Sequence, residues 1–291
     1  MNSASSESTK MVAYTFLSHQ PKKFPPSDDA TTGVRSKDVH ISPDTGVSAR
    51  IFLPKTPSPT QKLPYSSMYT VEAFLCFLPS LAPILTASTP SSLKLTSSPS
   101  RRIRFVPDRP IPACYEDSWA ALQWVASHAS GDGPEPWLND YADFNRVFIA
   151  GDSAGGNISH TLAVRVGSIG LTGVRVVGVV LVHPYFGGTD DDKMWLYMCP
   201  TNGGLEDPRM KPAAEDLARL GCEKVLVFVA EKDHLREVGW NYYEELKKSG
   251  WKGTVEIVEN HGEEHCFHLH DLSYEKSVDL IKQIASFINR E

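Results

Sequence analysis

The sequence predicts an α/β fold in which a mostly parallel sheet carries helices on both of its faces. Apolar strand patterns alternate with helix patterns from about residue 114 to the end of the chain. The run from Val174 to Val182 is apolar and rich in valine, as expected of a central parallel strand that is covered on both sides. With 291 residues, of which 41% are hydrophobic, the chain is long enough to bury one large core.

The first half of this pattern opens with a hairpin. Val39–Leu53 has the character of two antiparallel strands on either side of an Asp-Thr-Gly turn. Tyr115–His128 is predicted to be a helix, because its large apolar residues fall on one helical face. Arg146–Ala150 then forms a short buried strand, and Gly156–Val164 forms the helix that follows it.

The second half repeats the alternation. Lys224–Ala230 is a compact run of mostly β-branched residues and is predicted to be a buried strand. Thr254–Val258 alternates apolar and polar residues, which indicates a half-buried strand. Leu235–Ser249 and Tyr274–Asn289 are predicted helices, and the second carries an apolar stripe at helical spacing.

The strongest chemical signal is the pentapeptide Gly151-Asp152-Ser153-Ala154-Gly155, which lies between a predicted strand and a predicted helix. Small residues on both sides of Ser153 allow a very tight turn, so that its hydroxyl projects from the edge of the sheet. The next amide, that of Ala154, then points toward a developing oxyanion. This turn predicts a serine nucleophile.

A serine nucleophile needs a base and an acid that orients the base. Asp233 lies in the loop just after the strand Lys224–Ala230, where a site carboxylate is expected. The loop after Thr254–Val258 contains three histidines, at 261, 265 and 268. One of these histidines is predicted to be the base.

These features resemble the plant carboxylesterases of the hormone-sensitive-lipase-like branch of the α/β-hydrolases. The motif at 151–155, Asp233 after its strand and His265 in a His-x-Phe setting carry the resemblance, which extends over roughly residues 31–63 and 107–291. It implies an α/β-hydrolase domain over residues 35–291, preceded by an irregular N-terminal or lid segment over residues 1–34.

By this resemblance, Ser153, Asp233 and His265 form a catalytic triad, and the other residues of the pentapeptide shape the turn and the oxyanion site. The remaining nearby histidines, His261, His268 and His270, would then be surface or lid residues. The implied reaction is two-step acyl transfer on a small ester, with no metal and no organic cofactor. Trp195, Tyr197 and Met198 either line an acyl pocket or are buried residues of the cap.

Residues 65–103 interrupt this pattern. Serine, threonine and proline crowd the segment, and no strand-helix-strand unit is visible where the fold needs one. The prolines at 79, 83, 90 and 99 break helices and remove ladder donors, so the segment is predicted to lack both the buried parallel strand and its covering helix. Family members carry here a strand that ends in His-Gly-Gly-Gly-Phe, whose amides complete the oxyanion hole, and this sequence lacks that motif.

The codons of this segment suggest why the family motif is missing. Read from the third base of each codon, the codons from Pro64 through Phe74 can spell Leu-Leu-Val-Tyr-Val-His-Gly-Gly-Gly-Phe. We therefore interpret residues 65 to about 103 as a frameshifted stretch, with the frame regained by Pro107. A lineage-specific insert is the alternative.

Composition bears on the partners and the cellular location of the protein. A net charge of −6 disfavours a nucleic-acid partner. Five cysteines without paired spacing indicate free thiols in a reducing compartment, and the first thirty residues lack the apolar core of a secretory signal. The apolar stretch from Val71 to Leu85 is too short and too rich in proline to span a membrane. A cytoplasmic location is expected, and the sequence does not indicate an oligomeric state.

Two other functions stay open at this stage. Gibberellin receptors resemble the same family but carry an aliphatic residue in place of the triad histidine, whereas His265 is present here. Dehydratases of the hydroxyisoflavanone type are also similar in sequence and use the triad region for elimination.

Overall fold

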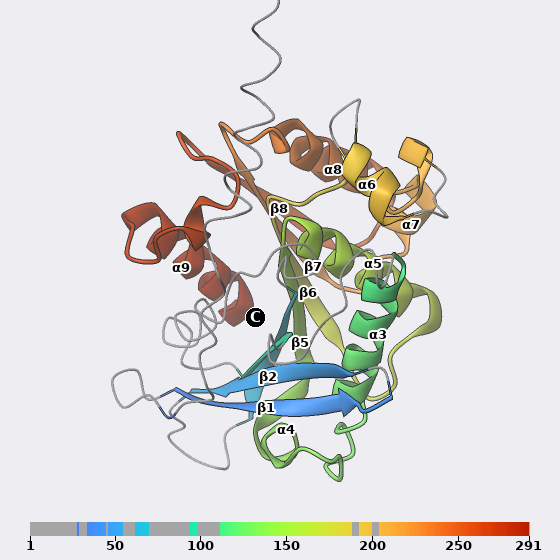
Figure 1. The fold of residues 1–291 in the computed structure, drawn as a ribbon, viewed down its shortest axis with the longest axis vertical. Helices are drawn as coiled ribbons and strands as arrows, with labels where there is room; N and C mark the ends of the chain where they lie inside the picture. Colours follow the sequence, from blue (N-terminus) through green and yellow to red (C-terminus); the bar gives the residue numbers. More distant parts are fainter. Residues whose placement is uncertain are drawn as a thin grey trace, which may run out of the picture.

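The computed structural model describes residues 28, 34–44, 46–54, 62–69, 93–97, 111–187, 192–199 and 204–290. An eight-stranded sheet runs through them in the order β1-β2-β4-β3-β5-β6-β7-β8 (Figure 1). The strands are β1 (Arg35–Ser42), β2 (Val47–Leu53), β3 (Leu63–Tyr69), β4 (Leu93–Ser97), β5 (Ala142–Asp152), β6 (Val176–Val182), β7 (Lys224–Ala230) and β8 (Thr254–Asn260). β2 is antiparallel to both β1 and β4, and every pair from β4 across to β8 is parallel.

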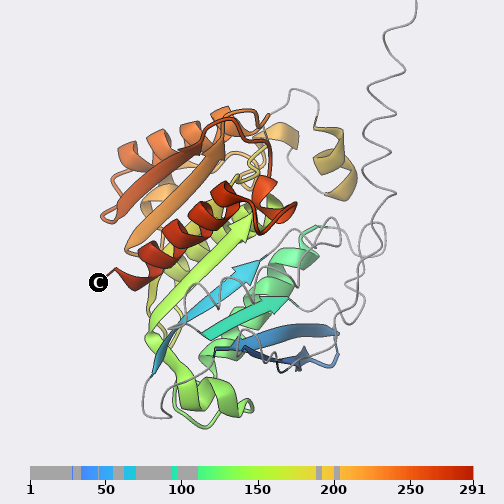
Figure 2. The same ribbon diagram turned by 90° about the vertical axis from the view of Figure 1, so that its left-hand side faces the viewer.

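Helices cover both faces of this sheet. The α-helices are α3 (Ala113–Ala126), α4 (Pro136–Tyr141), α5 (Ala154–Ile169), α6 (Lys193–Met198), α7 (Ala214–Ala218), α8 (Arg236–Lys248) and α9 (Glu275–Asn289). Two short 3-10 helices, η2 (Gly204–Glu206) and η3 (Phe267–Leu269), lie in the connections. α3 and α5 lie on one side of the sheet and α9 on the other, as the two views show (Figures 1 and 2).

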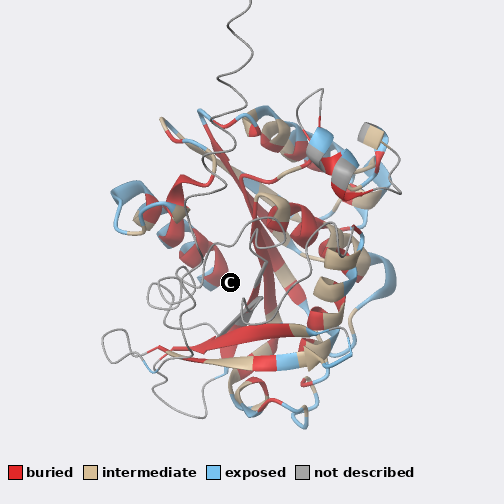
Figure 3. Cartoon of the chain, in the orientation of Figure 1, coloured by how far each residue is buried: buried red, intermediate tan, exposed pale blue. Residues whose placement is uncertain are grey.

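The core is split between the two faces because successive residues of a strand point to opposite sides. In β5, Ile149 packs in the cluster that includes α3, α5 and α8, whereas its neighbour Phe148 packs with α9. β5, β6 and β7 are therefore buried along most of their length, whereas β8 at the edge of the sheet is only partly buried (Figure 3). In α9 the predicted apolar stripe is this contact surface, with Ile281, Ile284 and Ile288 all buried.

The structure confirms the predicted α/β architecture and the predicted elements from residue 115 onward. β7 has the predicted bounds, and the hairpin of β1 and β2 is antiparallel as predicted. The main differences are in length: β5 begins at Ala142 instead of Arg146, and α5 extends to Ile169. The sequence predicts a shorter strand because the polar residues Asp143 and Asn145 interrupt the apolar pattern at the start of β5.

The prediction that residues 65–103 lack a buried parallel strand is wrong. β3 lies in the middle of the sheet, parallel to both β4 and β5, and Ser66 and Ser67 are buried. The reason is that a ladder is held by backbone hydrogen bonds to its neighbours, so serines with little strand propensity are accepted between two formed strands. None of the prolines expected to break the segment falls within β3 or β4, and Pro64 lies next to an irregularity in the β3–β5 register.

Other parts of the sequence hypotheses fall on residues that the structure does not describe. The predicted lack of a covering helix concerns residues 70–92, between β3 and β4, which lie outside the described residues. The predicted N-terminal segment 1–34 also lies outside them, apart from Asp28 and Val34. Among the helices of the described ranges, none combines the length and the apolar character that crossing a bilayer requires.

Candidate active site

A strained turn presents Ser153 at the carboxyl edge of the sheet. β5 ends at Asp152 and α5 begins at Ala154, and Ser153 between them has φ 54° and ψ −120°. A non-glycine residue at positive φ costs roughly 1–3 kcal/mol and persists only where the surroundings enforce it. Here the chain packs so closely that a Cβ on Gly151 would lie 2.2 Å from the carbonyl oxygen of Gly155. Of the small residues predicted for this turn, Gly151 is therefore required by its packing.

The structure brings Ser153, His265 and Asp233 together. The Oγ of Ser153 lies 3.0 Å from Nε2 of His265, and Nδ1 of His265 lies 2.6 Å from Oδ2 of Asp233. Ser153 follows β5, Asp233 follows β7, and His265 follows β8. These strands are parallel, so their carboxyl ends, and the residues that follow them, meet at one edge of the sheet.

Hydrogen bonds keep the Asp233 carboxylate ionised. Burial by itself raises its pKa, but hydrogen bonds from His234 and His265 and from the backbone N–H of Leu235 outweigh burial and hold the pKa well below its usual range. The Leu235 N–H donates to Oδ1 at 2.9 Å, which leaves Oδ2 directed at His265. The contact with His234 was not predicted, although its position directly after the predicted acid is a signal that could have found it.

A second buried acid, Asp207, is engaged elsewhere. Its carboxylate forms a two-point ion pair with the guanidinium of Arg209, at 2.7 and 2.8 Å. Arg209 in turn lies over the ring of Trp195, 5.3 Å from its centroid. Trp195 and Met198 are buried core residues of this region, and the side chain of Tyr197 lies outside the described residues.

The prediction that His268 is a surface or lid residue is wrong, whereas His261 and His270 are exposed as predicted. η3 turns the His268 side chain under the loop, where only 2% of it is exposed and its Nε2 lies 3.8 Å from Oδ2 of Asp152. Asp152, predicted as part of the turn, is fully buried. Neither side chain has a hydrogen-bond partner among the described residues, which makes them a buried polar pair beneath Ser153.

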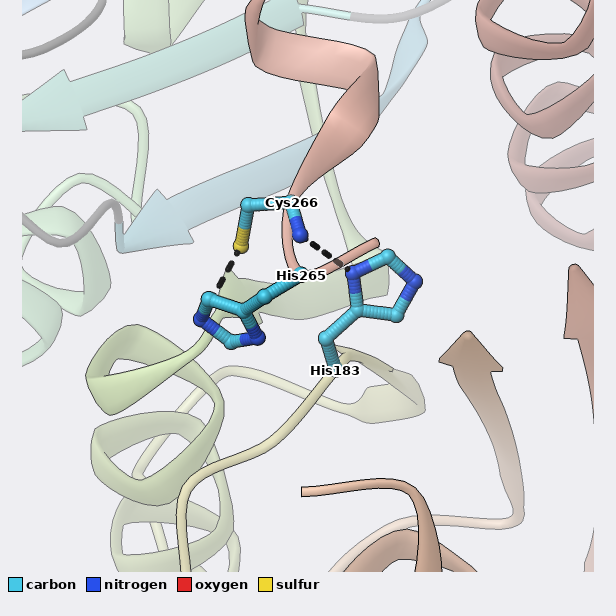
Figure 4. Close-up of side chains that lie close together, drawn as sticks. All are labelled: His183, His265 and Cys266. Carbon is cyan, nitrogen blue, oxygen red and sulfur yellow. Dashed lines mark hydrogen bonds between the residues drawn. The ribbon is translucent and has the colours of Figure 1, made fainter. Parts of the chain in front are cut away.

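A third histidine, His183, lies beside the same loop. His183, His265 and Cys266 present donor atoms within 4.8 Å of one another (Figure 4). These donors are already in use: Nδ1 of His183 accepts the backbone N–H of Cys266 at 2.9 Å, and both nitrogens of His265 have partners. Hydrogen bonding therefore accounts for the cluster without a metal ion.

Two buried histidines make the fold sensitive to acid. Burial lowers the pKa of His160 to about 4, partly opposed by Asp216, and burial together with His268 and His265 lowers that of His183 to about 3. A histidine in the unfolded chain titrates near ~6.5. Below that pH the unfolded state binds protons that the folded state refuses, so the free energy of unfolding should fall, by about 2 kcal/mol per histidine at pH ~5.

Denaturant titrations at pH 7 and pH 5 measure this decrease. His160→Phe removes one of the two titrating groups and should shrink the difference between the two pH values by about 2 kcal/mol. Equal unfolding free energies of the unsubstituted protein at both pH values would contradict the assignment.

Comparison with known proteins agrees with this architecture. A family model described as the alpha/beta hydrolase fold matches residues 102–269, which is more than half of the chain. A 2-hydroxyisoflavanone dehydratase from Glycyrrhiza echinata is 40% identical over 293 residues, covering 91% of this chain and 88% of that protein. Probable carboxylesterase 2 from Arabidopsis thaliana is 40% identical over 292 residues, with the same coverage of each.

The chain belongs to the α/β-hydrolase fold family, in the branch that contains these plant carboxylesterases. Among solved structures, a hyperthermophilic esterase from Pyrobaculum calidifontis superimposes with a TM-score of 0.69 at 24% identity, covering 87% of this chain and 85% of that one. This second likeness concerns the fold.

Proposed function

We propose that this protein is a carboxylic-ester hydrolase that acts on small esters through Ser153, His265 and Asp233. The observation that carries the proposal is the unbroken relay from hydroxyl to imidazole to carboxylate, with distances of 3.0 and 2.6 Å. A nucleophile with a base in hydrogen-bond reach, and a base held by a buried acid, is the arrangement that activates serine.

In this mechanism Ser153 Oγ attacks the ester carbonyl while His265 Nε2 takes the hydroxyl proton. The imidazolium then returns the proton to the departing alcohol, which leaves an acyl-serine. The same nitrogen then takes a proton from water, whose oxygen attacks the acyl group. The imidazolium returns this proton to Ser153 Oγ as the acyl–oxygen bond breaks and the carboxylic acid leaves. Asp233 accepts the Nδ1–H throughout and stabilises the imidazolium, for which its ionised state is suited.

The oxyanion site of this chain lacks some of the hydrogen-bond donors that the family uses. The backbone N–H of Ala154, at the first turn of α5, is one donor, and the helix N-terminus favours negative charge there. The other donors of the family belong to the His-Gly-Gly-Gly-Phe motif that the sequence lacks. Each lost donor costs ~10²–10³ in turnover, so we expect this chain to be a slow esterase.

A dehydratase is the second candidate, favoured by the 40% identity to a protein named 2-hydroxyisoflavanone dehydratase. Such an enzyme would eliminate water from a hydroxylated ring substrate instead of cleaving an ester. Incubation with a 2-hydroxyisoflavanone distinguishes the two, because elimination yields a product lighter by one water. Conversion of this compound faster than of any small ester would favour the dehydratase.

An active-site label tests whether the serine is activated. A fluorophosphonate probe should form a covalent adduct at Ser153, because labelling requires a hydroxyl deprotonated by a neighbouring base. Ser153→Ala should remove the adduct, and peptide mass mapping should place it at residue 153. Absence of labelling together with tight, saturable gibberellin binding would instead indicate a receptor.

We further infer a cytoplasmic location. None of the four described cysteines, Cys114, Cys199, Cys222 and Cys266, forms a disulfide, which suits a reducing compartment. Relatives carry names that place them in mitochondria and chloroplasts, so imaging of a fluorescent fusion should be the test. Co-localisation of the fusion with either organelle would contradict the inference.

A further inference from the structure

The segment Val182–Tyr185 connects the nucleophile to the base. On the nucleophile side, the N–H of Ser153 donates to the carbonyl of Val182 at 2.9 Å, and the N–H of Tyr185 donates to the carbonyl of Ser153 at 3.0 Å. The segment is itself anchored to the sheet, because the N–H of His183 donates to the carbonyl of Phe228 in β7 at 2.9 Å. Ser153 is thus held by the backbone on both sides of His183.

On the base side, the side chain of His183 makes the connection. Its Nδ1 accepts the backbone N–H of Cys266, the residue directly after His265, at 2.9 Å (Figure 4). Its Nε2 lies 3.4 Å from Oδ1 of Asn260, the last residue of β8, so the ring proton belongs on Nε2 and the lone pair on Nδ1. His183 is only 1% exposed, so the Cys266 amide would have no water to replace this acceptor.

Backbone strain marks the same junction. Among the described residues, the non-glycine residues at positive φ are Ser153 at 54°, His183 at 48° and Cys266 at 51°. Ser153 is the nucleophile, His183 connects it to the loop of the base, and Cys266 is the residue whose backbone N–H donates to His183. Strained conformations of this kind persist where the surrounding contacts over-determine them, and they concentrate at functional sites.

We propose that His183 is a positioning residue for the base: its neutral imidazole holds the Cys266 amide and thereby sets His265 at hydrogen-bond distance from Ser153. Ser153 and His265 are 112 residues apart in the chain, and both are tied to the one segment that contains His183. The inference rests on the proposed esterase function and adds to it a residue that touches neither substrate nor reacting atoms.

Nδ1 of His183 stays an unprotonated hydrogen-bond acceptor over the pH range in which an esterase works. Burial, reinforced by His268 and His265, lowers the pKa of His183 to about 3, whereas Asp233 and Asn260 act in the opposite direction. The ring is therefore neutral at pH values well below neutrality. A protonated ring would carry a donor on Nδ1 and would repel the Cys266 N–H.

Three substitutions of His183 test this role by the rate of fluorophosphonate labelling at Ser153. His183→Asn places an amide oxygen near the position of Nδ1 and tolerates positive φ, so its rate should stay within about 5-fold of the unsubstituted protein. His183→Leu has nearly the same shape without the acceptor, and His183→Gln moves its polar atoms toward the position of Nε2. Both should label about 100-fold more slowly, the loss expected when a reacting group is misplaced by about 1 Å.

His160→Leu is the matched control, because it makes the same replacement at another buried histidine, one that contacts Tyr242. It should destabilise the fold while keeping the labelling rate within about 3-fold, since it leaves the loop of His265 untouched. Thermal unfolding of each variant separates loss of fold from loss of alignment. If His183→Leu does not fold, the comparison of His183→Asn with His183→Gln carries the test.

Equal labelling rates for the Asn variant and the variants that lack the acceptor would overturn the proposal, as would a wild-type rate in a folded His183→Leu or His183→Gln. Failure of the proposed function has a different signature. In that case the unsubstituted protein and Ser153→Ala would show the same labelling, and no adduct would map to residue 153.

Discussion

Replacing Ser153 or His265 with alanine is expected to lower the hydrolysis of short-chain p-nitrophenyl esters by about 10⁴–10⁶-fold. The assay uses a version of the protein that carries His-Gly-Gly-Gly-Phe after β3, so that the starting activity is high enough to measure the loss. The reason is geometric: Nε2 of His265 lies 3.0 Å from the serine oxygen, and no other base is bonded to that oxygen among the described residues. Full activity after Ser153→Ala would reject the assignment.

The acid is tested by a matched pair of substitutions. Asp233→Asn should lower turnover by about 10⁴-fold, because an amide in place of Oδ2 favours the wrong imidazole tautomer. Asp207→Asn changes an equally buried carboxylate that binds Arg209 instead, and turnover measured on the folded fraction should remain close to that of the parent. A harmful Asp207→Asn beside a harmless Asp233→Asn would show that the wrong acid has been chosen.

Restoring the His-Gly-Gly-Gly-Phe motif in the stretch 65–103 is expected to raise esterase turnover at least about 10³-fold over the chain as given. The motif would supply two backbone N–H donors to the oxyanion site. Each donor is worth roughly 3–4 kcal/mol in the transition state. The measurement is kcat/KM for p-nitrophenyl acetate with both proteins at equal active-site concentration, titrated with the fluorophosphonate. Comparable values would mean that other amides already hold the oxyanion.

A second measurement addresses the origin of the stretch. Sequencing the transcript across codons 60–110 should reveal one base more than the present reading near Pro64, since the shifted frame spells the family motif. A transcript identical to the present reading would favour the lineage-specific insert. β3 and β4 both form from the sequence as it stands.

Features with a local signal in the sequence could be predicted. The turn at Gly151–Gly155 could be predicted because a tight strand-to-helix turn demands small residues at adjacent positions. The buried stripe of α9 could be predicted because its apolar residues recur at helical spacing within the fifteen residues of the helix. β3 was missed for the same reason, since Ser66 and Ser67 carry no local strand signal and are held by their neighbours.

By itself the sequence determined the layered α/β fold, the order of its strands and helices from α3 onward, the serine at the turn and the acid loop after β7. The local pattern left three histidines open as the base, and the family resemblance implied His265. The tertiary structure set His265 against Ser153, buried His268 near Asp152, and placed His183 against the Cys266 amide. The spacing of apolar residues along the chain predicts which face of its helix or strand a residue lies on. Pairing across more than seventy residues depends on where parallel strands end in space, and that is a property of the assembled sheet.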